Sequence, residues 1–297
     1  MSYARTSRDA RACPYGRRRS HGRVAALAAT FSFLYAFALS PASASAQAEA
    51  KPAASAVRLI ERDHPLAGRI WSVREGRFVP EADVIAAAGR ARFVLLGERH
   101  GNPEHHALQA RLVAATAAGG RPLAVVAEQL DFPQQAAIDA CRADCASFGA
   151  DLGPRVGWAD TGWPPYELYA PVFEAAAAAR ATVLAGNAGS ARIRALARGG
   201  AANAGEEGWI AAAREPLPAA GRERLVENLV AGHCGHLPPE RTEPLVHAQR
   251  LRDAAMAATL TRGAGDDGAA VLIAGNGHAR RDYGVPTLLA APRTLVV

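Results

Sequence analysis

The chain has 297 residues, of which 49% are hydrophobic and 21% charged, and its formal net charge is +6. This length suits one large domain or a domain with an insertion, and the apolar share predicts a globular protein with a substantial core. The basicity does not indicate nucleic-acid binding, because residues 1–46 carry seven arginines against the single Asp9, which by itself amounts to +6.

The first 46 residues have the pattern of an export signal. A basic stretch (17–23) precedes an apolar run (24–39), and small residues up to Ala46 supply a cleavage site. The run is shorter than the ~20 residues that a membrane-spanning helix needs, so a membrane anchor is the less favoured alternative. No cysteine stands at the cleavage site itself, which gives no support to a lipid anchor. We therefore predict a removed signal peptide (1–46) and a periplasmic or secreted mature protein.

Residues 47–62 are rich in Ala, Ser and Pro and predict a linker before a domain over residues 63–297. That domain contains Cys141, Cys145 and Cys234. Export implies an oxidising compartment, so one disulfide with one cysteine left over is the simplest expectation. Cys141 and Cys145 fall one helical turn apart, where a bridge is feasible but not favoured by an ideal helix. The pairing is left open.

Four short apolar runs have the length and β-branched content of buried strands. They are Phe93–Leu96, Leu123–Ala127, Thr182–Ala185 and Val271–Ala274. Because they show no alternation of polar and apolar residues, both faces of each strand should be covered. We predict an α/β fold with a mostly parallel sheet flanked by helices. Residues 68–73 are predicted as an additional early strand and residues 294–297 as a last one.

Helices are predicted between most of these strands. Asn102 can cap a helix that begins at Pro103, runs to Ala118 and stops at Gly119-Gly120. Further helices are expected over residues 133–143, 166–179, 222–230 and 243–262. The stretch from about 190 to 265 contains no strand candidate, which predicts a helical insertion or subdomain between the third and fourth strands.

Polar residues follow each of the four predicted strands. They are Gly97-Glu98, Glu128-Gln129, Gly186-Asn187 and Gly275-Asn276-Gly277-His278. The carboxyl ends of parallel strands lie along one edge of a sheet, where α/β proteins bind ligands. Glu98 and His100 are two residues apart, so a continuing strand would point both to one side. Of the adjacent pair His105 and His106, only one can easily face the site, and we favour His106.

Three interpretations fit these residues. Glu98, His100 and His278, with Glu128 near, suit a divalent metal ion in a hydrolase, or a glutamate acting as general base. Alternatively, an imidazole or a phenolate could be an axial ligand of haem iron. In the third interpretation the polar strand ends only cap the sheet through hydrogen bonds. Asn187 and Asn276 suit either a turn or a ligand contact.

Two other segments contain residue types that occur in ligand or metal sites. The stretch 157–171 contains Trp158, Trp163, Tyr166 and Tyr169, which favours packing at the sheet edge over a wall for a flat apolar ligand. The stretch "HCGHLPPE" (233–240) has a spacing reminiscent of metal sites, but a turn that closes a helix is the favoured interpretation.

The chain resembles the ChaN-like haem-binding uptake proteins, which are grouped with the Tiki and GumN-type proteins in one superfamily. The resemblance covers roughly residues 65–290. Its motifs, in the family's order, are "LLGERHGNPEHHALQARL", "AVVAEQLD", "WPPYELYAPVFEAA" leading to "VLAGNAG", "HCGHLPPE" and "VLIAGNGHARRDYGVP". The resemblance implies an exported α/β protein that binds haem during iron acquisition. It also allows a homodimer and an outer-membrane haem receptor as partners.

Carried over residue by residue, the resemblance implies Glu98, His100 and His278 as catalytic or metal-binding residues of a metal-dependent peptidase or hydrolase. The strand-end argument adds Glu128 as a further candidate ligand. For haem or another small ligand, the candidate residues are Arg99, His100, His106, Tyr166, Tyr169, Asn187, Asn276 and His278. Arg99 could pair with a haem propionate or face solvent. Haem binding is the favoured function, the hydrolase is the alternative, and no single tyrosine is assigned to the iron.

Overall fold

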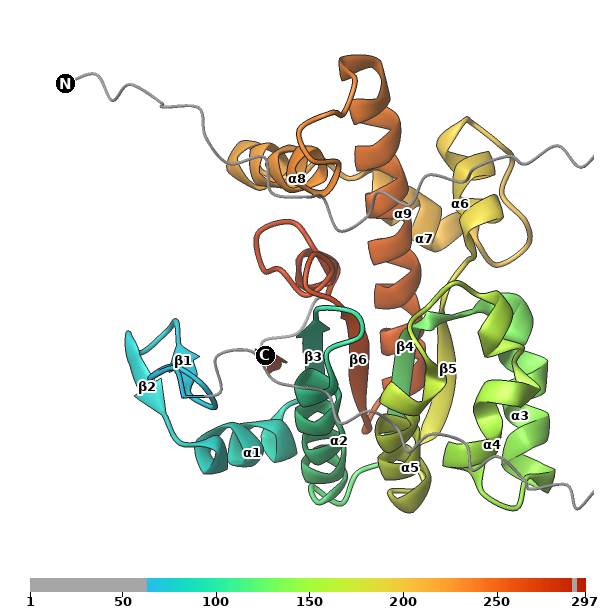
Figure 1. The fold of residues 1–297 in the computed structure, drawn as a ribbon. Helices are drawn as coiled ribbons and strands as arrows, with labels where there is room; N and C mark the ends of the chain where they lie inside the picture. The colour runs from blue at the N-terminus through green and yellow to red at the C-terminus, as the bar shows by residue number, and fades with distance from the viewer. Residues whose placement is uncertain (1–62, 290–292) are drawn as a thin grey trace, which may run out of the picture. The chain divides into compact units, whose positions relative to one another are not determined.

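The computed structural model describes residues 63–289 and 293–297. The predicted signal peptide and linker lie outside these residues. Five parallel strands form the sheet, in the order β5-β4-β6-β3-β7 (Figure 1). Their bounds are β3 Phe93–Glu98, β4 Leu123–Asp131, β5 Thr182–Asn187, β6 Ala269–Gly275 and β7 Thr294–Val296. In the described part of the chain, no helix is long and apolar enough to cross a membrane.

Alternate residues of each strand pack on opposite faces of this sheet. On β3, Val94 and Leu96 belong to one core cluster, together with residues of α2 (Pro103–Ala117) and α5 (Ala170–Ala178). Phe93 and Leu95 belong to a second cluster, with residues of α9 (Pro239–Ala264). Figure 1 shows α2 and α5 on one face and α9 along the other. The predicted α/β class, with a parallel sheet covered on both faces, is confirmed.

The helix after β3 begins as its sequence predicts. The Asn102 side chain accepts a hydrogen bond from the Glu104 backbone N–H at 3.0 Å, and Pro103 occupies the first turn. The helix ends at Ala117, one residue before the expected end, and Gly120 follows with a φ of +72°. This cap fixes the direction in which α2 leaves the carboxyl end of β3.

The early strand is shorter than predicted and belongs to a separate sheet. Strand β1 (Ile70–Ser72) pairs with β2 (Arg77–Val79) in an antiparallel hairpin. Its partner β2 was not predicted, because three residues are too few for a periodic signal. Two helices, α1 (Glu81–Arg90) and α4 (Phe148–Arg155), were also missed. Helix α4 was missed because it contains Gly149, Gly153 and Pro154, and these residue types rarely indicate a helix.

Two helices begin later than expected because a 3-10 turn precedes each. Phe132–Gln134 forms η1 before α3 (Gln135–Asp144), and Tyr166–Leu168 forms η3 before α5. Within α3, Cys141 forms a disulfide with Cys145, which follows its last turn. Cys234 is not a free thiol either, so the expected left-over cysteine is not seen.

All the regular structure between β5 and β6 is helical. The helices are α6 (Ser190–Ala197), α7 (Glu207–Arg214), α8 (Ala219–Gly232) and α9. Residues of α6, α7 and α9 share a third hydrophobic cluster. The second half of α9 continues beneath the sheet, where Met256 and Leu260 are fully buried. One helix thus belongs both to the helical region and to the layer that supports the strands.

Candidate functional site

Glu98 is the centre of a buried hydrogen-bond network at the carboxyl end of β3. The residue is only 2% exposed, yet both side-chain oxygens accept hydrogen bonds. The donors are His100 Nδ1 at 2.8 Å, Tyr169 Oη at 3.0 Å and Gln129 Nε2 at 3.0 Å, all to Oε1, and Gln109 Nε2 at 3.0 Å to Oε2. These donors come from β3 and its extension, α2, β4 and the start of α5. We call Glu98 and these four donors the Glu98 centre.

The Glu98 centre stabilises a buried negative charge. Burial alone would raise the pKa of the Glu98 carboxyl, but the hydrogen bonds and nearby imidazoles outweigh it and hold that pKa well below its usual range. The pKa of the Tyr169 hydroxyl is shifted in the opposite direction, upwards, because burial and the adjacent Glu98 charge both disfavour the phenolate. Glu98 is therefore ionised at neutral pH and Tyr169 is a neutral donor.

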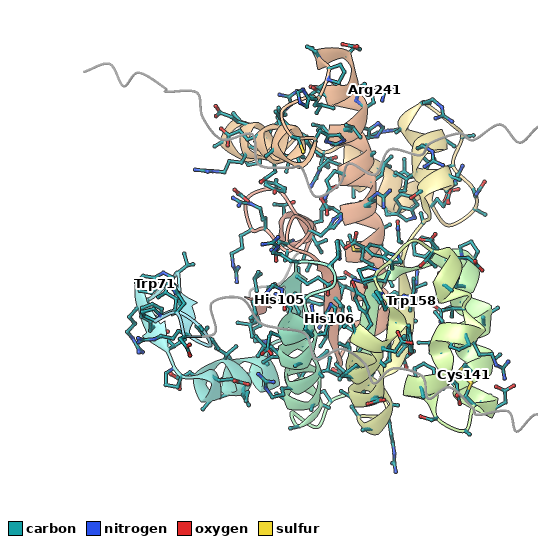
Figure 2. All side chains as sticks on the ribbon, in the orientation of Figure 1. Trp71, His105, His106, Cys141, Trp158 and Arg241 are labelled. Carbon is teal, nitrogen blue, oxygen red and sulfur yellow. A yellow bond between two sulfur atoms is a disulfide. The ribbon has the colours of Figure 1, made fainter. Side chains whose placement is uncertain are left out.

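His106 is buried beside the same carboxylate. Its Nε2 lies 3.4 Å from Glu98 Oε2, and its ring packs on Tyr169 with a centroid distance of 4.1 Å. Neither ring nitrogen has a hydrogen-bond partner among the described residues. In Figure 2, His105 and His106 lie at the start of α2, beside the end of β3. His106, which the sequence argument favoured over His105, does face the Glu98 centre. His105 instead accepts a hydrogen bond from the Arg99 backbone N–H at 3.0 Å.

His100 connects the Glu98 centre to the surface. Its side chain is 29% exposed, and its ring meets Trp163 edge-on at a centroid distance of 4.8 Å. On the other side it lies against Gly275, where an added Cβ would be 2.8 Å from His100 Nε2. Burial would lower the pKa of His100, but Glu98 and Glu128 raise it overall. The expected arrangement of Glu98 and His100 on one side of the extended chain is what the structure shows.

His278 lies in a second buried group, the His278 triad, formed with Glu128 and Asp253. His278 Nδ1 is 2.6 Å from Asp253 Oδ1, and its Nε2 is 3.3 Å from Glu128 Oε1. Glu128 Oε2 also accepts a hydrogen bond from the Gly275 backbone N–H at 2.7 Å. Gln249, one turn before Asp253 on α9, has its Nε2 3.1 Å from His278 Nδ1. The end of β4, the turn after β6 and α9 therefore meet at one imidazole.

The charges of the His278 triad depend on each other. Burial would lower the pKa of His278, but Glu128 and Asp253 raise it to about 10. Burial would raise the pKa of Glu128, but His278 and His100 lower it to about 2. For Asp253 burial dominates, so its pKa lies above the usual range although His278 opposes this. The triad therefore contains a protonated imidazole between carboxyl groups at neutral pH.

Gly275 lies between the two groups. A Cβ there would contact His100 Nε2 at 2.8 Å and Glu128 Oε2 at 3.6 Å. Glu98, His100, Glu128 and His278 are thus brought together at the ends of three neighbouring strands, as the strand-end argument predicted.

Other residues singled out from the sequence lie elsewhere. The Tyr166 hydroxyl donates to the Gly149 carbonyl at 2.6 Å, and its ring lies against Gly153 of α4. Arg99 and Asn276 are exposed, and the Asn276 backbone N–H donates to the Glu98 carbonyl at 2.9 Å. Trp158 is buried against Tyr169 and donates to the Pro164 carbonyl, in agreement with packing at the sheet edge.

The stretch "HCGHLPPE" forms a turn at the end of α8. His233 Nδ1 lies 2.7 Å from the Leu229 carbonyl, and Cys234 and Gly235 have φ values of +55° and +75°. The favoured interpretation of this stretch as a helix-closing turn agrees with that geometry.

Gln109 and Asp253 are the site residues that the sequence did not reveal. Each is a polar residue among the buried residues of its helix, α2 or α9, and both are at most 2% exposed. Asp253 follows Arg250 and Arg252 and precedes the apolar run 254–257, and an acid at this point of a helix is the only signal that could have been noticed. A buried charge in such a run indicates a partner but does not say which one.

Beside the Glu98 centre lies an open polar cleft of about 450 Å³. Residues that line it include Gln129, Asp131, Trp163, Asn187, Ser190 and Arg252. The residues of β4 that line the cleft lie where its pairing with β5 is irregular, because the register shifts between Ala127 and Asp131. Such bulges redirect side chains at strand ends. Asn187, one of the expected haem contacts, lines this polar cleft.

These observations define an α/β protein with a Glu–His centre at the carboxyl edge of its sheet. The family model for haem-binding uptake proteins, ChaN, of the Tiki superfamily matches residues 84–289. The chain belongs to this family, as its sequence motifs suggested. The match includes every residue of the Glu98 centre and the His278 triad.

A solved structure agrees with the fold. ChaN of Campylobacter jejuni, whose structure is described as showing cofacial haem binding, is 19% identical with a TM-score of 0.60, over 73% of this chain and 83% of that one. The type III effector HopBA1 is 15% identical with a TM-score of 0.36, over 66% of this chain and 71% of that one, which is too weak for any inference. No curated protein matches the chain.

The donor set does not fit the divalent metal ion of the alternative interpretation. A metal ion needs oxygen and nitrogen lone pairs that converge on one point. Here both Glu98 oxygens accept hydrogen bonds, and both His278 nitrogens face carboxylates. Across residues 63–289 and 293–297, no group of three or more His, Cys, Asp or Glu side chains is placed to hold a metal ion. The predicted metal site is therefore not supported.

Proposed function

We propose that the protein binds haem at the outer edge of the Glu98 centre, with His100 as the residue that faces the iron. The observation that carries this proposal is the hydrogen bond between His100 Nδ1 and the buried Glu98 carboxylate at 2.8 Å. A carboxylate on one ring nitrogen fixes the imidazole's orientation and makes the other nitrogen a better ligand. His100 is also the partly exposed imidazole of the site, whereas His106 and His278 are buried.

The surroundings of His100 support a flat ligand there. Trp163 meets the imidazole edge-on and offers an aromatic surface beside it. Bound haem would supply an iron atom, and the His100 imidazole would be the group that holds it. The protein's own contribution is to hold one imidazole rigidly: Glu98 orients the ring, Gln109, Gln129 and Tyr169 orient Glu98, and Gly275 leaves space for the ring.

Haem binding would serve uptake outside the cytoplasm. This part of the proposal is supported by the export-signal pattern of residues 1–46 and by the family's description as uptake proteins. The cofacial haem binding described for the Campylobacter jejuni protein suggests more than one haem per assembly, and with it a homodimer. An outer-membrane haem receptor would be the corresponding source or acceptor of haem.

Haemin titration of the purified protein tests the proposal. We expect a saturable shift of the Soret band in the wild type. His100→Ala should lose at least about tenfold in affinity, since it removes the imidazole that would hold the iron. His236→Ala is the matched control, because His236 is an exposed histidine on the loop between α8 and α9. An unchanged titration for His100→Ala would refute His100 as the iron-facing residue, and the absence of any Soret shift in the wild type would refute haem binding.

A further inference from the structure

The polar cleft contains groups that the Glu98 centre does not use. Gln129 donates through Nε2 to Glu98, but its Oε1 is buried without a hydrogen-bond partner in the described structure. The Gln129 residue as a whole is 1% exposed. A buried acceptor that lacks a donor costs free energy, so this oxygen favours a ligand that brings an N–H or O–H group.

Two opposite charges line the cleft without touching. Asp131, at the end of β4, and Arg252, on α9, both border it, and Arg252 acts electrostatically on the Asp131 carboxyl. Despite this attraction, neither has an ion-pair partner within 4.0 Å among the described residues. The guanidinium makes one long hydrogen bond, to Ser190 Oγ at 3.3 Å. Most of its donors therefore remain available for an anion.

Asn187 adds a further donor. It lines the cleft and is buried, and its Oδ1 accepts a 3.4 Å hydrogen bond from the Gly189 backbone N–H. Its Nδ2 has no hydrogen bond to the described part of the chain. By contrast, the Gln134 side chain accepts from the Asp131 backbone N–H and donates to the Val156 carbonyl, so it belongs to the wall.

We infer that this cleft is a binding site for a small zwitterion of the α-amino-acid class. The carboxylate would lie against Arg252 and the Asn187 amide, and the ammonium group would lie between Asp131 and Gln129 Oε1. The arrangement satisfies the unpartnered acceptor and neutralises both wall charges at once. A volume of about 450 Å³ is within the range of small-molecule sites. The inference does not depend on haem binding.

Isothermal titration calorimetry of the purified protein tests this inference. The probes are the common L-amino acids, followed by propionate and ethylamine, which each carry one of the two charges. We expect at least one amino acid to bind with a Kd below about 1 mM. Propionate and ethylamine should bind at least about tenfold more weakly, because each leaves one wall charge unpaired.

Two isosteric or near-isosteric variants locate the site. Arg252→Gln and Asp131→Asn should each weaken amino-acid binding at least about tenfold. Arg262→Gln, an exposed arginine of the same helix, and Asp83→Asn, an exposed residue of α1, should leave it unchanged. Haemin titration of the same variants should match the wild type, which separates this inference from the haem proposal.

Three results would overturn the inference. The first is that no amino acid binds at 10 mM. The second is binding that survives both Arg252→Gln and Asp131→Asn, which would place the ligand elsewhere. The third is propionate binding as tightly as the best amino acid, which would make the cleft a simple anion site.

Discussion

His278 Nδ1 lies 2.6 Å from Asp253 Oδ1, although the strand-end motif and the helix that supply them are 25 residues apart. Asp253 is completely buried on α9, and its second oxygen has no hydrogen-bond partner among the described residues. The contact joins the long helix to the turn after β6. Because His278 also faces Glu128, the same imidazole joins α9 to β4. The charges of the His278 triad thus connect α9 to the carboxyl end of β4.

Stability should depend on the charge of His278 at alkaline pH. The pKa of His278 is raised to about 10 from an ordinary value of 6.5. A raised pKa means that protonation stabilises the fold; the contribution is complete below about pH 6.5 and is lost as the pH rises through about 10. Asp253→Asn should lower this pKa and move the alkaline loss of stability to lower pH. Urea unfolding from pH 6.5 to 10, with NMR titration of the histidine rings, measures both effects.

The control for this experiment is Asp266→Asn, an exposed aspartate in the loop between α9 and β6. It should reproduce the wild-type pH profile. A free energy of unfolding that does not change between pH 6.5 and 10 in the wild type would contradict the predicted ionisation of His278.

Glu98→Gln should strongly destabilise the fold. The amide replaces an oxygen that accepts hydrogen bonds with an NH₂ group, so buried donors meet another donor. Loss of a charged partner in a buried network costs about 3–5 kcal/mol. Tyr169→Phe removes only one hydrogen bond to the same carboxylate and should cost about 1–2 kcal/mol. Urea unfolding of both variants measures the difference in the free energy of unfolding.

Glu104→Gln is a suitable comparison for Glu98→Gln, because Glu104 is exposed in the first turn of α2. Its effect should stay within about 1 kcal/mol. Equal losses for Glu98→Gln and Glu104→Gln would show that the buried network is not a principal source of stability.

Gly275→Ala should disturb His100 directly. Its new methyl group would lie 2.8 Å from His100 Nε2 and 3.0 Å from Cε1, so the imidazole must move. If His100 faces the iron, haemin affinity should fall at least about tenfold. Gly277→Ala is a close control, because the nearest atom to its added Cβ is Gln249 Nε2 at 3.8 Å. Haemin titrations that are equal for the two variants would argue against His100 in this role.

Sequence periodicity predicted the sheet because its strands are continuous apolar runs that differ clearly from the helices around them. The order of the strands could not be predicted in this way, since pairing depends on the paths of the connections. Strand β1 lies within the predicted early strand over residues 68–73, whereas its partner β2 has three residues, too few for a pattern. Helix α4 was not predicted because it contains glycines, which do not favour a helix. These glycines are needed for tertiary packing, since they leave room for Glu174 and Tyr166 at close range.

Only those site residues that stand directly after a predicted strand could be predicted from the sequence. Glu98, His100, Glu128 and His278 stand at strand ends, and the parallel topology is sufficient to bring them together. Asp253 and Gln109 lie on helices, and their partners depend on how those helices pack. Tyr166 and Tyr169 are equivalent by sequence, whereas the structure turns only the Tyr169 hydroxyl towards Glu98.

The position of β6 has a consequence for how the protein is made. This strand lies between β3 and β4, but residues 269–275 are synthesised more than a hundred residues after both. Until then, two hydrophobic strands that precede it have unpaired backbone edges, which invite association with other chains. The nascent polypeptide is therefore most exposed to edge-to-edge association until its final segment has been synthesised.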